Sequence, residues 1–99
     1  MEFYTKVVGV SFDGRQRIIR QTRVGETLSL VREPNNPYDR NAIMVLNSSG
    51  SQLGYISKDV ASNLAYNMDL GARYIATVTN VTGTNPGDVM GVNILVRQV

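Results

Sequence analysis

The segment Pro34-Asn35-Asn36-Pro37-Tyr38-Asp39-Arg40-Asn41 holds the residues of this 99-residue chain that are best suited to binding chemistry. Proline fixes φ at about −65° and pushes the residue before it into an extended conformation, while Asn and Asp bond their own neighbouring backbone. The segment is therefore predicted to form a rigid polar loop that loses little entropy when a ligand binds. At its end, Tyr38 and Asp39 offer a flat aromatic face and a charged acceptor within one short reach.

Several other chemistries are excluded by composition. The chain has neither cysteine nor histidine, so it lacks thiolate metal sites, disulfides and the usual general base. Its eight acidic residues are scattered, whereas a metal-dependent nuclease needs several carboxylates converging on one site. The sequence therefore predicts a protein that is not an enzyme, with no catalytic residue, no metal site and no cofactor.

Positive charge is concentrated near the N-terminal end. The formal net charge is only +2, but four arginines fall within nine residues, at Arg15, Arg17, Arg20 and Arg23. Phosphate attraction acts over a Debye length of about 8 to 10 Å, so local density matters more than the sum. The cluster is a candidate phosphate contact or, because its spacing need not place the four side chains on one face, a solvated hairpin.

The N-terminal residues do not form a signal peptide, because an acid precedes the first lysine and no apolar core comes after it. No apolar segment is long enough to span a membrane. Together with the absence of cysteine, this predicts a cytoplasmic protein without a membrane partner.

Short strand-like runs separated by turn signals indicate a single domain over residues 1–99. Strands are predicted at 6–12, 26–32, 42–46, 52–56, 72–82 and 89–98, and one helix from an N-cap at Ser57 to about Leu70, closed by Gly71. Six strands with a single helix exclude a parallel α/β fold, which needs a helix between most strands. The pattern predicts a mainly β fold, a small and partly open six-stranded β-barrel with one covering α-helix.

Alternation assigns faces to some of these elements. Leu28 and Leu30 share one face of the second strand, as do Val92, Ile94 and Val96 in the last strand. Gly9, inside the first predicted strand, indicates a bulge or tight bend. The helix presents one apolar stripe that includes Met68, and that stripe and Tyr55 are assigned to the core.

The loop and the residues after it resemble the signature of the HIRAN domain family. The resemblance rests on Pro34 to Ile43, then on Gly50, Leu53-Gly54-Tyr55-Ile56, Lys58 and the helix at 61–64, and it covers about residues 7–70. It implies an OB-like barrel of the kind found fused to Swi/Snf-type DNA translocases in postreplication repair, and also as free-standing bacterial and phage proteins. It further implies a module that binds single-stranded DNA at its free 3′-hydroxyl end.

The resemblance also implies roles for individual residues. Asn35 and Asn36 would contact the last nucleotides, Tyr38 would stack on a base, and Asp39 would accept a hydrogen bond from the terminal 3′-hydroxyl. A carboxylate would also repel a 3′-phosphate, so it would select a free end. From the residues alone, packing of Tyr38 on the barrel and an Asx turn at Asp39 stay open.

The resemblance implies two further contacts, and the sequence departs from the family pattern at two positions. Lys58 would meet a phosphate, and Phe12 would provide a second stacking surface, although its position is equally compatible with the core. Ser11 stands where related domains place an arginine, and Tyr55 where a histidine can occur. The phosphate contact is then either weaker or supplied by the arginine cluster.

The functional hypothesis is a nucleic-acid-binding module for single-stranded DNA 3′ ends in repair or replication-fork processing, acting beside a helicase or nuclease. The alternative is a protein-protein interaction or adaptor domain that does not touch DNA. Base stacking tolerates any sequence, and the choice between DNA and RNA stays open.

Overall fold

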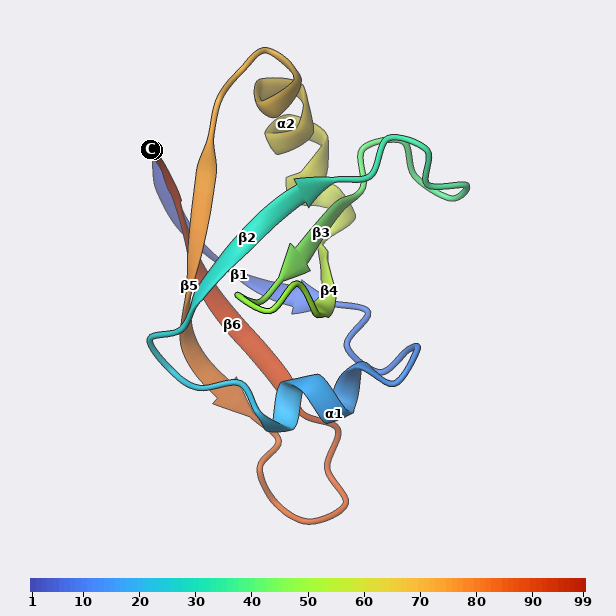
Figure 1. Cartoon of the computed structure of the whole chain (residues 1–99), viewed down its shortest axis with the longest axis vertical. Helices are drawn as coiled ribbons and strands as arrows, with labels where there is room; N and C mark the ends of the chain where they lie inside the picture. The colour runs from blue at the N-terminus through green and yellow to red at the C-terminus, as the bar shows by residue number, and fades with distance from the viewer.

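The computed structural model describes residues 1–99 and forms one closed antiparallel β-barrel (Figure 1). Its elements are β1 (Glu2–Val8), α1 (Arg15–Arg20), β2 (Thr27–Arg32), β3 (Ile43–Leu46), β4 (Gln52–Ile56), α2 (Lys58–Asp69), β5 (Tyr74–Thr82) and β6 (Gly91–Gln98). The strands follow the order β1-β4-β3-β2-β5-β6 around the barrel. Closure leaves no unpaired sheet edge, and the predicted six-stranded mainly β barrel is confirmed.

The core fills the barrel interior because the strands alternate apolar and outward-facing residues. In β6, Val92, Ile94 and Val96 have no exposed surface, and Leu28 and Leu30 of β2 are buried as their spacing predicted. The remaining strands add one to three buried hydrophobic residues each, namely Val7, Ile43, Val45, Leu53, Ile56, Tyr74, Ala76 and Val78.

The two helices lie at opposite ends of the barrel (Figure 1). The long helix α2 begins after Ser57, as predicted, and buries Ala61, Leu64 and Ala65. Gly71 follows it with a φ of 106°, a conformation that glycine adopts at low cost. Neither helix has the length and hydropathy that crossing a membrane requires.

The N-terminal part of the chain differs from the prediction. The first strand is β1, Glu2–Val8, rather than residues 6–12, because its residues pair with β6 from Glu2 onward. Gly9 follows the strand with a φ of 70° and begins the turn after it, so it forms the tight bend of the two predicted alternatives rather than a bulge. The following arginine segment is the short helix α1 rather than a hairpin, so the structure adds a second helix to the predicted one.

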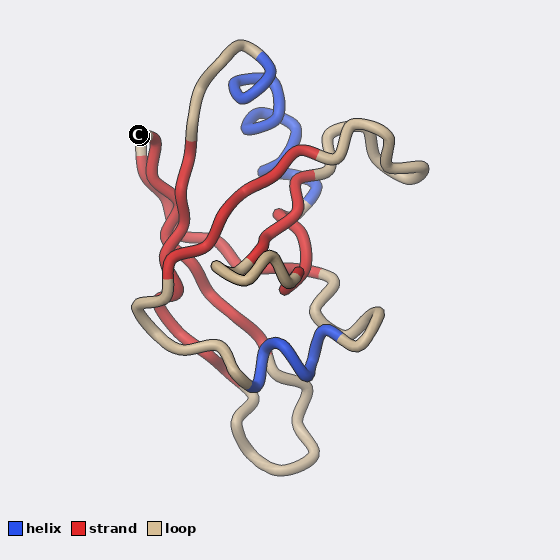
Figure 2. Tube along the Cα trace, viewed as in Figure 1, coloured by secondary structure: helices blue, strands red, loops and turns tan.

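Two loops project from the same side of the barrel and frame the end of β4 (Figures 1 and 2). They are the 9–14 turn, between β1 and α1, and the 33–42 loop, between β2 and β3. Between them, β4 approaches β1 closely at Gly54, where any Cβ would collide with the carbonyl oxygen of Val8. This glycine allows the barrel to close and places the next residue, Tyr55, between the two loops.

Candidate nucleic-acid interface

Two adjacent pockets lie beside the 33–42 loop, and we refer to them together as the two-part cleft. The first lies between this loop and the ends of β1 and β4 with the start of α2, and the second between this loop and the 9–14 turn. The Lys58 pocket, of about 250 Å³, is lined by Val8, Asn36, Tyr38, Asp39, Ala42, Tyr55, Ile56 and Lys58. The Phe12 pocket, of about 710 Å³, is lined by Gly9, Phe12, Asp13, Arg15, Glu33, Asn36, Pro37, Tyr38 and Tyr55. Asn36, Tyr38 and Tyr55 line both, so the pockets meet at these side chains.

The 33–42 loop is closed by backbone hydrogen bonds at its base and within it. The N–H of Glu33 donates to the carbonyl of Ala42 at 2.9 Å, and the N–H of Ala42 donates to the carbonyl of Asp39 at 3.1 Å. The N–H of Asn36 donates to the carbonyl of Glu33 at 3.1 Å. These bonds account for much of the loop backbone, in agreement with the rigidity that its prolines predict.

Arg32, the last residue of β2, holds the C-terminal part of the loop in place. Its guanidinium donates to the carbonyl oxygens of Ala42 at 2.8 Å and of Arg40 at 2.9 Å. The same group forms a two-point ion pair with Asp69 of α2, at 3.0 and 3.3 Å. Two-point pairs of arginine with carboxylates fix geometry as well as adding energy, so this arginine ties the loop to the covering helix.

The side chains of Glu33 and Asn36 link the loop to β4. Oε1 of Glu33 accepts hydrogen bonds from the Tyr55 hydroxyl at 2.8 Å and from Nδ2 of Asn36 at 2.6 Å. Oδ1 of Asn36 in turn accepts the backbone N–H groups of Tyr38 at 2.8 Å and of Asp39 at 3.0 Å. A chain of hydrogen bonds therefore runs from β4 to the residues at the end of the loop.

The assignment of Tyr55 to the core is wrong. It pairs with Val8 and Met44 on the outward face of β4 and is only half-buried. Because its neighbours Gly54 and Ile56 are buried, the local pattern does not mark the tyrosine as a residue that lines a cleft. Its ring and hydroxyl instead support the two loops.

Replacing Glu33 by alanine is expected to loosen the end of the loop without unfolding the barrel. Loss of a hydrogen-bond acceptor of this kind costs about 1 kcal/mol, so amide exchange at Tyr38 and Asp39 should accelerate about fivefold. Hydrogen-deuterium exchange measures this, with the Ile94 amide in β6 as the internal control. Glu33→Gln keeps an acceptor oxygen and should restore most of the protection. Unchanged exchange at Tyr38 and Asp39 in Glu33→Ala would show that the chain of hydrogen bonds does not hold the loop.

Tyr38 and Asp39 lie side by side at the cleft. The Tyr38 side chain is 90% exposed, so its ring is not packed on the barrel. Oδ1 of Asp39 accepts the backbone N–H of Asn41 at 2.9 Å, which is the Asx turn that the residues alone allowed. Its Oδ2 contacts no donor of the chain, so one carboxylate oxygen stabilises the loop and the other is open to a ligand.

The other predicted site residues are distributed around these two. Phe12 is 65% exposed and lines the Phe12 pocket, which decides against a core position. Lys58, the first residue of α2, lines the Lys58 pocket and forms no salt bridge. Asn36 lines both pockets, but its amide is used within the loop, and exposed Asn35 lines neither pocket.

The structure separates the arginine cluster. Arg15 is buried and lines the Phe12 pocket, whereas Arg17, Arg20 and Arg23 line neither pocket. No sequence signal distinguishes Arg15 from its neighbours, because only the short helix α1 turns it inward. Glu33 was also missed as part of the site, since its sequence position only marks it as the residue before Pro34.

The charge of the two-part cleft is balanced rather than basic. Two cations, Arg15 and Lys58, line it together with three carboxylates, those of Asp13, Glu33 and Asp39. A groove that follows a continuous phosphate backbone is expected to be strongly positive. This cleft is better suited to a ligand that presents an aromatic base, a hydroxyl and few phosphates.

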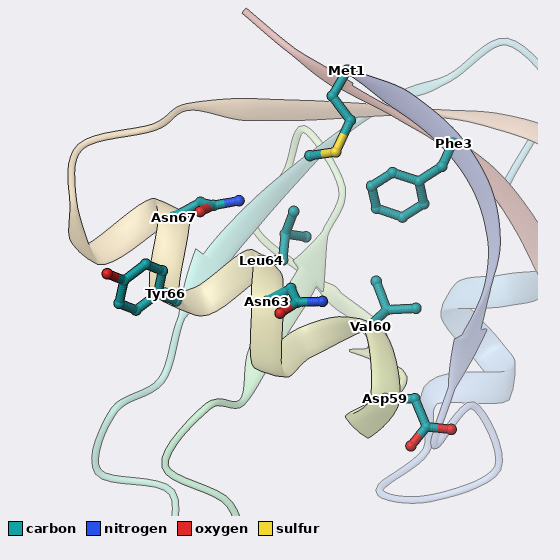
Figure 3. A pocket seen from close by; sticks show the side chains of 8 residues that line it. All are labelled: Met1, Phe3, Asp59, Val60, Asn63, Leu64, Tyr66 and Asn67. Atoms are coloured by element: carbon teal, nitrogen blue, oxygen red, sulfur yellow. The ribbon is translucent and has the colours of Figure 1, made fainter.

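A third pocket, of about 570 Å³, lies between the start of β1 and α2. Figure 3 shows Met1 and Phe3 facing Val60 and Leu64 of the helix. The only charged side chain in its lining is that of Asp59, a carboxylate that repels phosphate. None of the predicted site residues lies there, and no group of three or more acidic side chains comes together to hold a metal ion anywhere in the chain.

Comparison with known proteins relates the chain to one family. The helicase-like transcription factor of rabbit, Oryctolagus cuniculus, is 59% identical over 44 residues, which are 44% of this chain and 4% of that relative. The crystal structure of the HIRAN domain of human HLTF is 34% identical with a TM-score of 0.72, over 96% of this chain and 74% of that one. An NMR structure of the HLTF HIRAN domain in its DNA-bound conformation is 30% identical with a TM-score of 0.64, over 98% and 73% of the two chains.

The chain thus spans a small fraction of the curated relative and most of the isolated domain. The family model of the HIRAN domain matches residues 1–96, which include nearly all of the barrel and both loops of the cleft. With the barrel, the loops and these similarities in agreement, the chain belongs to the HIRAN domain family.

Proposed function

We propose that residues 1–99 form a single DNA-binding domain that holds the free 3′ end of single-stranded DNA in the two-part cleft. The observation that carries the proposal is the exposed Tyr38 ring beside Asp39, whose Oδ2 has no partner in the chain. The DNA-bound conformation of a structural relative supports the choice of DNA as ligand.

The proposed recognition divides between stacking and hydrogen bonding. Tyr38 and Phe12, both exposed and both on the Phe12 pocket, would stack on bases, each contributing about 1 to 3 kcal/mol without sequence preference. Oδ2 of Asp39 would accept a hydrogen bond from the terminal 3′-hydroxyl, and Lys58, which lines the same pocket as Asp39, would contact a phosphate. Asn36 would act by holding Tyr38 and Asp39 in place. Asn35 would contact the last nucleotides from the loop surface.

The carboxylate makes the site selective for an end. A phosphate at the 3′ position would approach Asp39 as a like charge, whereas a hydroxyl donates to it. The balanced charge of the cleft fits the same ligand, because a strand end requires few phosphate contacts. In this proposal the domain performs no reaction itself and presents strand ends to a separately supplied helicase or nuclease in cytoplasmic DNA repair or fork processing.

Fluorescence anisotropy with one labelled oligonucleotide sequence tests the proposal. The strand ending in a 3′-hydroxyl is expected to bind at least about tenfold more tightly than the strand with a 3′-phosphate, which corresponds to about 1.4 kcal/mol. A strand phosphorylated at its 5′ end, with a free 3′ end, controls for added charge. An RNA strand of the same sequence decides between DNA and RNA.

Two results would overturn the proposal in different ways. Equal affinity for free and phosphorylated 3′ ends would remove end recognition while leaving strand binding in place. Absence of binding to any strand at low salt would remove the nucleic-acid function, and a stable protein complex recovered instead would favour the adaptor alternative.

A further inference from the structure

The Arg15 side chain is an unusual cation because it is buried yet faces a pocket. It is 10% exposed, and it is the only cation in the lining of the Phe12 pocket. Nη1 donates to the carbonyl of Gly9 at 2.8 Å, and the guanidinium carbon lies 5.2 Å from the centre of the Tyr55 ring. These contacts fix the group in one position, so it loses little entropy when an anion binds.

The counter-ion of Arg15 is weak. Nη2 reaches Oδ2 of Asp13 at 3.4 Å, and the Asp13 side chain is 82% exposed. Charge-assisted N–H···O bonds are normally about 2.7 to 2.9 Å long, and a buried charge without a close partner is costly. Oε1 of the other nearby carboxylate, Glu33, already accepts bonds from Tyr55 and Asn36, and it forms no salt bridge with Arg15.

The guanidinium therefore has binding capacity that the chain does not use. Of its five N–H donors, only those to Gly9 and Asp13 reach acceptors of the protein. Two exposed aromatic residues, Phe12 and Tyr38, line the same pocket. An anion bound to Arg15 would thus occupy the same pocket as the two rings on which bases are proposed to stack.

We infer that Arg15 binds a backbone phosphodiester of the strand and that Asp13 is the displaceable counter-ion that occupies this position in the free domain. The inference rests on the proposed function, since it names the residue that grips the strand next to its stacked bases. Arginine suits the role because its planar fork matches two phosphate oxygens at once. Exchange of a loose carboxylate for a closely bound phosphate leaves the Gly9 and Tyr55 contacts unchanged.

Substitution of Arg15 tests the inference against a matched control. Arg15→Gln should weaken binding of a 3′-hydroxyl strand about tenfold or more, because hydrogen bonds to charged groups carry about 1.5 to 3 kcal/mol. It should also reduce the slope of log affinity against log salt by about 0.7, the value for one phosphate of a single strand. Arg17→Gln removes the same charge from the exposed part of α1 and should change both quantities much less.

Asp13 provides a second test that does not depend on tolerance of a change at Arg15. Asp13→Asn removes the competing carboxylate from an exposed position and should raise affinity about two- to fivefold, the range expected for an exposed ion pair. Asp88→Asn makes the same charge change in the β5–β6 loop and should leave affinity nearly unchanged. If the Arg15–Asp13 pair had only a structural role, Asp13→Asn would lower the affinity instead, because losing the pair would loosen the cleft.

Neutral methylphosphonate linkages, placed one at a time in the last three positions of the strand, identify the contact. One linkage should weaken binding to the parent domain, and the same linkage should have no added effect on Arg15→Gln.

The inference is wrong if the parent domain binds DNA but Arg15→Gln and Arg17→Gln behave alike, or if Asp13→Asn weakens binding. If the parent domain binds no strand, both the proposed function and this inference fail. Thermal unfolding of each variant verifies that the barrel is retained, and if Arg15→Gln does not fold, the Asp13 and methylphosphonate results on the parent decide the inference.

Discussion

Tyr38→Ala is expected to reduce affinity for single-stranded DNA about 5- to 150-fold, whatever the sequence of the strand. Stacking of a base on an aromatic side chain is worth about 1 to 3 kcal/mol by alanine substitution. The ring is 90% exposed in the free domain, so its removal should change the free energy of unfolding by no more than about 0.5 kcal/mol. Anisotropy titrations and thermal unfolding, run on the same samples, separate the two effects.

Two variants sharpen this prediction. Tyr38→Phe keeps the stacking face and should retain nearly all of the affinity. Tyr66→Ala removes another exposed tyrosine from α2, in the lining of the pocket in Figure 3 rather than of the cleft, and should have no effect. An equal loss in Tyr38→Ala and Tyr66→Ala would contradict a specific stacking role for the loop tyrosine.

Asp39→Asn is expected to abolish most of the preference for a free 3′ end. The amide oxygen can still accept the N–H of Asn41, so the Asx turn is retained while the charge is lost. Binding of the 3′-hydroxyl strand should weaken because a charge-assisted hydrogen bond is replaced by a neutral one. Binding of the 3′-phosphate strand should strengthen as repulsion disappears, and the ratio of the two affinities should fall at least about tenfold.

The ratio, rather than either affinity alone, is the informative quantity for Asp39. A general gain of positive charge would strengthen the binding of both strands equally and leave the ratio of the two affinities unchanged. Asp88→Asn serves as the control for that effect, because it lies in the loop between β5 and β6. An unaltered ratio in Asp39→Asn would mean that end selection, if present, is made by another group.

The barrel could be predicted well from the sequence, because local periodicity determines which residues of each strand face the core. Alternation placed Leu28, Leu30 and the apolar residues of β6 inside, and the N-cap and closing glycine set the limits of α2. Closure of the barrel was underestimated, since it depends on a close approach of β1 and β4 at Gly54. Such an approach involves residues far apart in the sequence and has no local pattern.

The site was predicted in part for a similar reason. The residues of the loop and their chemistry can be read locally, as for Tyr38 and Asp39. The groups that hold the loop cannot, because Arg32 meets Asp69 across 37 positions and Tyr55 meets Glu33 across 22. The inward position of Arg15 depends on α1, a six-residue helix whose intrinsic signal is weak.

The most direct test of the two-part cleft as the DNA site is a titration of the isotopically labelled domain with a short 3′-hydroxyl oligonucleotide, followed through backbone amide chemical shifts. We expect the largest shifts in the 9–14 turn, at residues 36–41 and around Tyr55 to Lys58. Shifts concentrated instead around the Figure 3 pocket, at Phe3 and along α2 near Asn63 and Asn67, with the two loops unaffected, would contradict a DNA site in this cleft.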